Sequence, residues 1–91
     1  MYNYSKENLD KNIIYEIDKF FCEAEVDMVL LSDLGNLLKL EINNKINLRY
    51  NDKVRNINSY IHKTHNSLSK FIKNNTEYKI ENIDNNICVL K

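Results

Sequence analysis

The spacing of the apolar residues constrains the fold of this chain more than any other feature of its sequence. Over residues 9–22 the apolar positions recur at intervals of three and four, the period of an α-helix with a single apolar stripe. Ser5 or Asn8 is the predicted N-cap of this helix. The stripe consists of Leu9, Ile13, Ile14, Ile17, Phe20 and Phe21. The polar residues expected outside the stripe are Lys11, Glu16, Asp18 and Lys19.

Residues 26–31 are apolar and β-branched enough to predict a short strand that leads into a second helix. Ser32 is the predicted N-cap of that helix, and the pair Asn43 and Asn44 is its predicted end. Gly35, the only glycine of the chain, lies inside the helix, where we expect it to serve close packing rather than ligand binding. The predicted apolar face is Leu34, Leu37, Leu38 and Ile42.

Helical spacing returns from Asp52 and continues to Ile72. Residues 64–67 are weak helix formers and include good N-caps, so two helices are predicted here rather than one. From Tyr78 onward apolar and polar residues alternate around turn-forming residues at 84–86, which predicts a C-terminal β-hairpin. The element order predicts an α+β winged helix-turn-helix with three to four helices, in which the short strand joins the hairpin as a third strand. The 91 residues fit one domain, with residues 1–8 as a mobile N-terminal extension.

The net charge is zero, but the charges are unevenly distributed along the chain. Residues 1–30 contain three lysines and seven acids, whereas residues 44–79 contain eight basic residues and two acids. Such asymmetry is compatible with a surface that faces a polyanion. It is more typical of a solvated basic face that the acidic N-terminal helix neutralises by packing beside it.

The basic segment supplies the candidate nucleic-acid-binding residues. Flexible cations bind phosphates, and exposed Tyr50 or His62 would stack on unpaired bases. Tyr60 fits the core and the surface equally well. The candidates are Arg49, Lys53, Arg55, His62, Lys63, Lys70, Lys73 and Lys79.

Signals for catalysis, cofactors and metals are weak. One glycine cannot build a glycine-rich phosphate loop, and no nucleophile–base pair stands out, so we expect neither an enzyme, nor a cofactor, nor a small-molecule substrate. His62 and His65 with Cys22 and Cys88 would make a poor zinc set, because zinc fingers draw their ligands in close pairs. We expect solvent-facing histidines and two buried cysteines.

Two compositional features bear on the source and location of the chain. Sixteen asparagines accompany eleven isoleucines, eleven lysines and six tyrosines, which indicates an AT-rich genome rather than a functional asparagine tract. No apolar run approaches the roughly 18 residues of a membrane span, and the polar N-terminus does not resemble a signal peptide. We therefore expect an intracellular domain without a membrane partner, in the cytoplasm rather than the nucleus.

Three separated motifs resemble the LOTUS (OST-HTH) domain, a winged-helix family. Val26-Asp-Met-Val-Leu-Leu-Ser-Asp-Leu-Gly-Asn-Leu-Leu38 is similar to that family's first strand and Leu-Ser-x-Leu-Gly-x-x-Leu helix. Ser67-Leu-Ser-Lys-Phe-Ile72 is similar to its Leu-x-x-Phe-Leu helix, and Tyr78-Lys-Ile80 with Cys88-Val-Leu90 to its wing strands. The resemblance covers residues 10–91. It departs from the family pattern at Glu25-Val26-Asp27, where Pro or Gly is common, and in a longer stretch over residues 43–66.

The resemblance implies a winged helix in RNA regulation, with either RNA binding, including G-rich quadruplex RNA, or docking of a DEAD-box helicase. The helicase-docking form has an additional C-terminal helix, whereas this chain stops at Lys91, just after the last predicted strand, which favours RNA. A protein-interaction domain is the second hypothesis, with an exposed apolar patch at Ile46, Leu48 and Tyr50. Duplex DNA binding is the third, and it is disfavoured because Arg55 is the only arginine in the candidate recognition helices.

Overall fold

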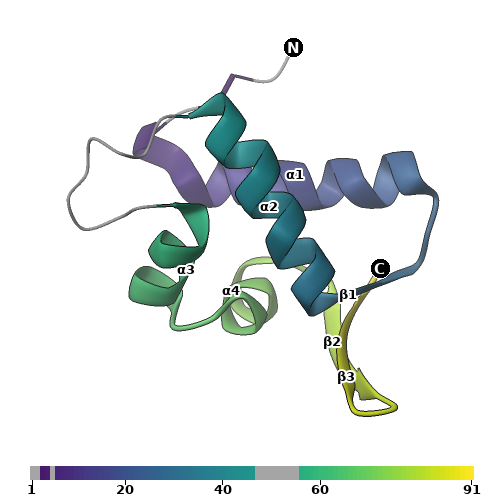
Figure 1. The fold of residues 1–91 in the computed structure, drawn as a ribbon. Helices are drawn as coiled ribbons and strands as arrows, with labels where there is room; N and C mark the ends of the chain where they lie inside the picture. The colour runs from purple at the N-terminus through teal and green to yellow at the C-terminus, as the bar shows by residue number, and fades with distance from the viewer. Residues whose placement is uncertain (1–2, 5, 47–55) are drawn as a thin grey trace.

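The computed structural model of the protein describes residues 3–4, 6–46 and 56–91. A short 3-10 helix, η1 (Lys6–Asn8), leads into α1 (Leu9–Ala24), and β1 (Met28–Leu30) leads directly into α2 (Leu31–Lys45). The chain continues with α3 (Ile57–His65), α4 (Leu68–Asn75), β2 (Lys79–Ile83) and β3 (Asn86–Leu90) (Figure 1). In the described ranges the predicted α+β winged-helix arrangement is confirmed, with four α-helices and one antiparallel sheet.

The sheet has the strand order β1–β3–β2, so the strand nearest the N-terminus joins the C-terminal hairpin as predicted. Leu30 pairs with Cys88, and Ile83 pairs with Asn86 across the hairpin. Asp84 and Asn85 form the two-residue turn with φ values of 52° and 68°. Asp and Asn tolerate this left-handed conformation better than other side chains, which is why the pair closes the hairpin. We call this turn, together with the ends of β2 and β3 that flank it, the wing.

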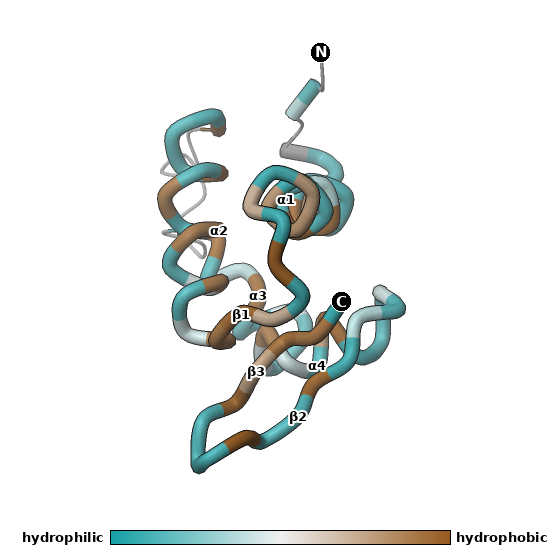
Figure 2. The backbone as a smooth tube through the Cα atoms, turned by 90° about the vertical axis from the view of Figure 1, so that its right-hand side faces the viewer, coloured by the Kyte–Doolittle hydropathy of each residue, from teal (hydrophilic) through white to brown (hydrophobic). Residues whose placement is uncertain are grey.

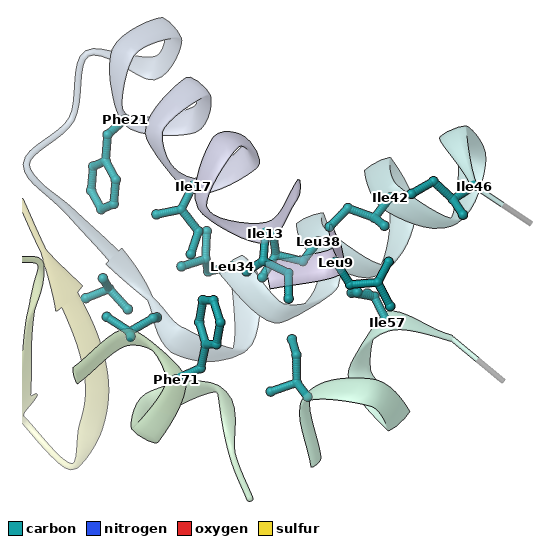
Figure 3. Close-up of a cluster of buried hydrophobic side chains, with 13 residues drawn as sticks. Leu9, Ile13, Ile17, Phe21, Leu34, Leu38, Ile42, Ile46, Ile57 and Phe71 are labelled. Carbon is teal, nitrogen blue, oxygen red and sulfur yellow. The ribbon is translucent and has the colours of Figure 1, made fainter. Parts of the chain in front are cut away.

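One apolar core joins the helices to the inner face of the sheet (Figure 3). Every fourth residue of α1 from Leu9 to Phe21 belongs to this core, and the tube view shows apolar residues recurring along both α1 and α2 (Figure 2). Complete burial of a large aliphatic or aromatic side chain contributes about 1.5–3 kcal/mol, so this cluster dominates the stability. The cluster contains Leu9, Ile13, Ile17, Phe21, Leu34, Leu38, Ile42, Ile46, Ile57, Ile61, Phe71, Ile72 and Val89.

Two predictions about α1 are wrong. Glu16, expected in solvent, is only 2% exposed, because Tyr4 covers it and donates its hydroxyl hydrogen to the Glu16 carboxylate. Tyr4 also packs edge-on against Tyr15, with ring centroids 5.9 Å apart. Cys22, expected in the core, is exposed, whereas Cys88 is buried as predicted. Of the proposed N-terminal extension, residues 1, 2 and 5 lie outside the described residues.

The boundaries of α2 also differ from the prediction. The helix begins at Leu31, so Ser32 lies in its first turn and does not cap it. At the other end the helix continues through Asn43 and Asn44 to Lys45. Ile42 and Ile46 are both buried, so the apolar face of the helix extends one turn beyond the predicted end. No helix in the described parts of the chain has the length and apolar character needed to cross a bilayer.

The predicted break between α3 and α4 is confirmed, and its capping is visible. The backbone N–H of Lys70 donates to Ser67 Oγ over 3.2 Å, and the backbone N–H of Ser59 donates to Asn56 Oδ1 over 3.0 Å at the start of α3. Asn66 between the two helices has a φ of 70°. The caps therefore fix where each short helix begins.

Candidate nucleic-acid interface

The predicted binding residues divide into two groups. Arg49, Lys53 and Arg55 lie outside the described residues, as do Leu48 and Tyr50 of the predicted patch. Ile46, the third member of that patch, is buried at 6% exposure, so this residue cannot contribute to an exposed apolar surface. The remaining candidates are all exposed, namely His62, Lys63, Lys70, Lys73 and Lys79.

Lys70 and Lys73 lie together on α4, the helix that directly precedes the hairpin. They are three residues apart, which places them side by side on one helix face. Phe71 and Ile72 are fully buried on the opposite side and hold α4 against the core. Neither lysine makes an ion pair with a described residue. The two lysines are therefore exposed on a helix that its buried face holds against the core.

Lys79 belongs to a different surface. Side chains alternate along β2, and Ile80 packs against the core on the inner face of the sheet. Lys79 and Glu81 therefore lie on the outer face, away from the helices. The structure does not bring Lys79 together with the lysines of α4.

His65 and Tyr60 are structural rather than solvent-facing. His65 Nε2 and the Tyr60 hydroxyl both donate to Asp10 Oδ1, over 2.9 Å and 2.7 Å, and tie α3 to the start of α1. His65 also packs edge-on against Phe71, with ring centroids 4.8 Å apart. Burial and the hydrogen bond to Asp10 raise the pKa of Tyr60 to about 12. The prediction of two solvent-facing histidines holds for His62 and is wrong for His65.

Three of the four acids of α1 are hydrogen-bonded to tyrosine hydroxyls. Asp18 accepts a hydrogen bond from the Tyr78 hydroxyl over 2.5 Å, as Glu16 does from Tyr4 and Asp10 from Tyr60. Burial first, and then the bond to Asp18, raises the pKa of Tyr78. None of these three acids forms an ion pair with a lysine of α4.

A groove of about 620 Å³ opens between the first half of α2, the end of α3, the α3–α4 turn and the wing. We call it the wing groove. Its apolar walls are formed by Leu31, Ile61, Leu68 and Ile87. His62 is the only titratable side chain among its described lining residues. The amides that line it belong to Asn36, Asn58, Asn66, Asn85 and Asn86.

Sequence reasoning missed this groove. Its amides are scattered between residues 36 and 86 and meet only in three dimensions. The one sequence feature that pointed to the groove was Gly35 on α2. It lines the groove, and a larger side chain there would narrow the groove. A Cβ atom at Gly35 would lie 3.7 Å from Leu68 Cδ2, an ordinary van der Waals distance. The glycine is therefore not needed to make room for Leu68.

Comparisons with protein-family models, curated proteins and solved structures find no match to this chain.

Proposed function

We propose that this domain is a non-enzymatic RNA-binding module that contacts the phosphate backbone through the exposed face of α4. The observation that carries the proposal is the pair Lys70 and Lys73, which faces solvent without an acidic partner among the described residues. Two ammonium groups on one helix face suit two phosphates of one strand, because each phosphate that a lysine neutralises releases condensed counterions.

The surroundings of the pair support a polyanionic ligand. From α3 to the start of β2, residues 57–80 contain four lysines and one acid, Glu77. His62, exposed at the end of α3, adds a ring on which an unpaired base would stack. The LOTUS resemblance favours RNA, including G-rich quadruplex RNA, and a role in the cytoplasm. Duplex DNA is less suitable because neither α3 nor α4 contains arginine, the commonest base-reading residue.

A protein partner, such as a DEAD-box helicase or a second copy, is the second candidate function. Strand β1 is at the edge of the sheet and exposes apolar side chains, Met28 at 47% and Leu30 at 37%. Exposed edge strands are common sites of strand pairing with other chains. Light scattering coupled to size-exclusion chromatography tests for the second copy, because a self-associating domain would have a measured mass above that of the monomer.

The direct test is fluorescence anisotropy of the purified domain with G-rich quadruplex RNA, unstructured RNA and duplex DNA at two salt concentrations. The proposal predicts preferential RNA binding that weakens as salt rises, since neutralised phosphates release counterions. Absence of RNA binding at low salt would refute it and redirect attention to the β1 edge. Preference for duplex DNA would equally contradict it.

A further inference from the structure

We infer that the wing groove binds an unpaired base of the same RNA strand whose phosphates lie on α4. This inference rests on the proposed function and adds to it a base-recognition site on described residues. None of the groove residues except His62 was among the predicted binding residues.

The size and chemistry of the groove suit an uncharged heteroaromatic ligand. Its volume of about 620 Å³ lies within the range of small-molecule sites, which is about 300–1,000 Å³. Leu68 and Ile87 offer apolar surface for the faces of a base, and carboxamides offer donors and acceptors for its edges. A phosphate would find no lysine or arginine among the described lining residues, so it belongs on α4 outside the groove.

Several of the amides are free to recognise a ligand. The side chains of Asn36, Asn66 and Asn85 make no hydrogen bond to another described residue. Asn58 donates weakly to the Gly35 carbonyl over 3.5 Å, which leaves its own carbonyl oxygen available. A bound base would therefore replace water at these amides without breaking a strong internal bond.

Carboxamides suit the edge of any unpaired base. A carboxamide pairs in a bidentate manner with a base edge that places a donor beside an acceptor, such as N6 and N7 of adenine or N3–H and O4 of uracil. The described lining residues include five amides but no Arg, Lys, Asp or Glu. The groove therefore suits an uncharged base rather than a charged group.

The groove and the α4 lysines are adjacent. Ser67 lines the groove, and its Oγ accepts a hydrogen bond from the backbone N–H of Lys70 over 3.2 Å. His62 lines the groove from α3, where it would stack on the inserted base or its neighbour. A strand that crosses the start of α4 would thus place one nucleotide at the mouth of the groove.

The test uses labelled oligo(A), oligo(U), oligo(C) and an abasic ribose-phosphate strand of equal length, measured by fluorescence anisotropy on the whole chain. Asn36→Leu replaces an exposed amide of the groove with an apolar side chain. Asn44→Leu makes the same substitution at an exposed position of α2 outside the groove and is the matched control. Circular dichroism confirms that both variants are folded.

We expect the wild type to bind the base-bearing strands about tenfold more tightly than the abasic strand, the gain expected of one bidentate pair. Asn36→Leu should lower the affinity for oligo(A) to that for the abasic strand, and Asn44→Leu should leave it unchanged. Equal binding of oligo(A) and the abasic strand, or equal behaviour of the two variants, would overturn the inference while leaving the proposed function intact. Absence of binding to every strand would refute both.

NMR provides a second measurement that needs no variant. On addition of oligo(A), the side-chain amide signals of Asn36, Asn58 and Asn85 should shift together with the backbone signals of α4. Shifts confined to α4 would show phosphate contact without base recognition and would overturn the inference.

Discussion

At the scale of single residues, three carboxylates of α1 each receive a tyrosine hydroxyl from a distant part of the chain. Asp10 also receives His65, which lies 55 positions away in the sequence. The bond to Glu16 satisfies a carboxylate that is only 2% exposed and would otherwise be costly to bury, whereas Asp18 remains exposed. These bonds explain why sequence periodicity failed at Glu16 and His65, because neither side chain's partner is a neighbour on its own helix.

Tyr60 should make stability depend on alkaline pH. Burial and Asp10 raise its pKa from the ordinary 10.0 to about 12 in the folded protein. The folded state thus favours the neutral phenol. The contribution of Tyr60 to the free energy of unfolding is therefore complete below pH 10 and is lost as the pH approaches 12. Urea unfolding of the wild type and of Tyr60→Phe between these values should show a steeper decline for the wild type. Parallel declines would contradict this assignment.

Gly35 gives a second prediction at this scale. A methyl group at this position meets only the side chain of Leu68 at an ordinary distance, and alanine favours a helix interior over glycine. Gly35→Ala should therefore raise the free energy of unfolding by about 1 kcal/mol, measured by urea denaturation. A loss of stability would show that the packing against Leu68 is tighter than the structure indicates.

At the scale of elements, apolar spacing was sufficient to predict α1, the apolar face of α2, the two short helices and the hairpin. These elements follow from the local spacing of apolar residues and from turn-forming residues, and both signals can be recognised in a short stretch of sequence. The ends of α2 were predicted wrongly because burial of Ile46 outweighed the turn preference of Asn43 and Asn44. The wing groove was beyond prediction, since its walls come from separate elements.

The caps provide a sharp test at this scale. Ser67 accepts a hydrogen bond at the start of α4, whereas Ser32 lies inside the first turn of α2 and is exposed. Ser67→Ala should lower the free energy of unfolding by about 1 kcal/mol, and Ser32→Ala should change it much less. Thermal and urea unfolding of the two variants measure both changes in the free energy of unfolding. A larger loss from Ser32→Ala would restore the original sequence prediction.

At the scale of the whole molecule, the charges are separated between two parts of the fold. The acids are concentrated on α1, the connection after it and α2, whereas the described lysines beyond residue 57 lie on α3, α4 and β2, apart from Lys91 after β3. Figure 1 shows α3 and α4 next to each other below α1 and to the left of the lower half of α2. This separation survives in three dimensions because α1 binds tyrosines and a histidine instead of lysines, and it leaves α4 free to meet a polyanion.

The most direct test of this account compares two charge reversals in RNA binding, measured by anisotropy across a range of salt. The first double variant, Lys70→Glu with Lys73→Glu, reverses the two charges of α4. The control double variant, Lys11→Glu with Lys39→Glu, makes the same change in net charge at exposed positions of α1 and α2. We expect the α4 variant to lose about tenfold or more in affinity and to show a shallower salt dependence, by about 0.7 in slope for each lysine. The control variant should bind nearly as the wild type does. Equal losses in the two variants, or no loss in either, would contradict a role for α4 as the RNA-binding face.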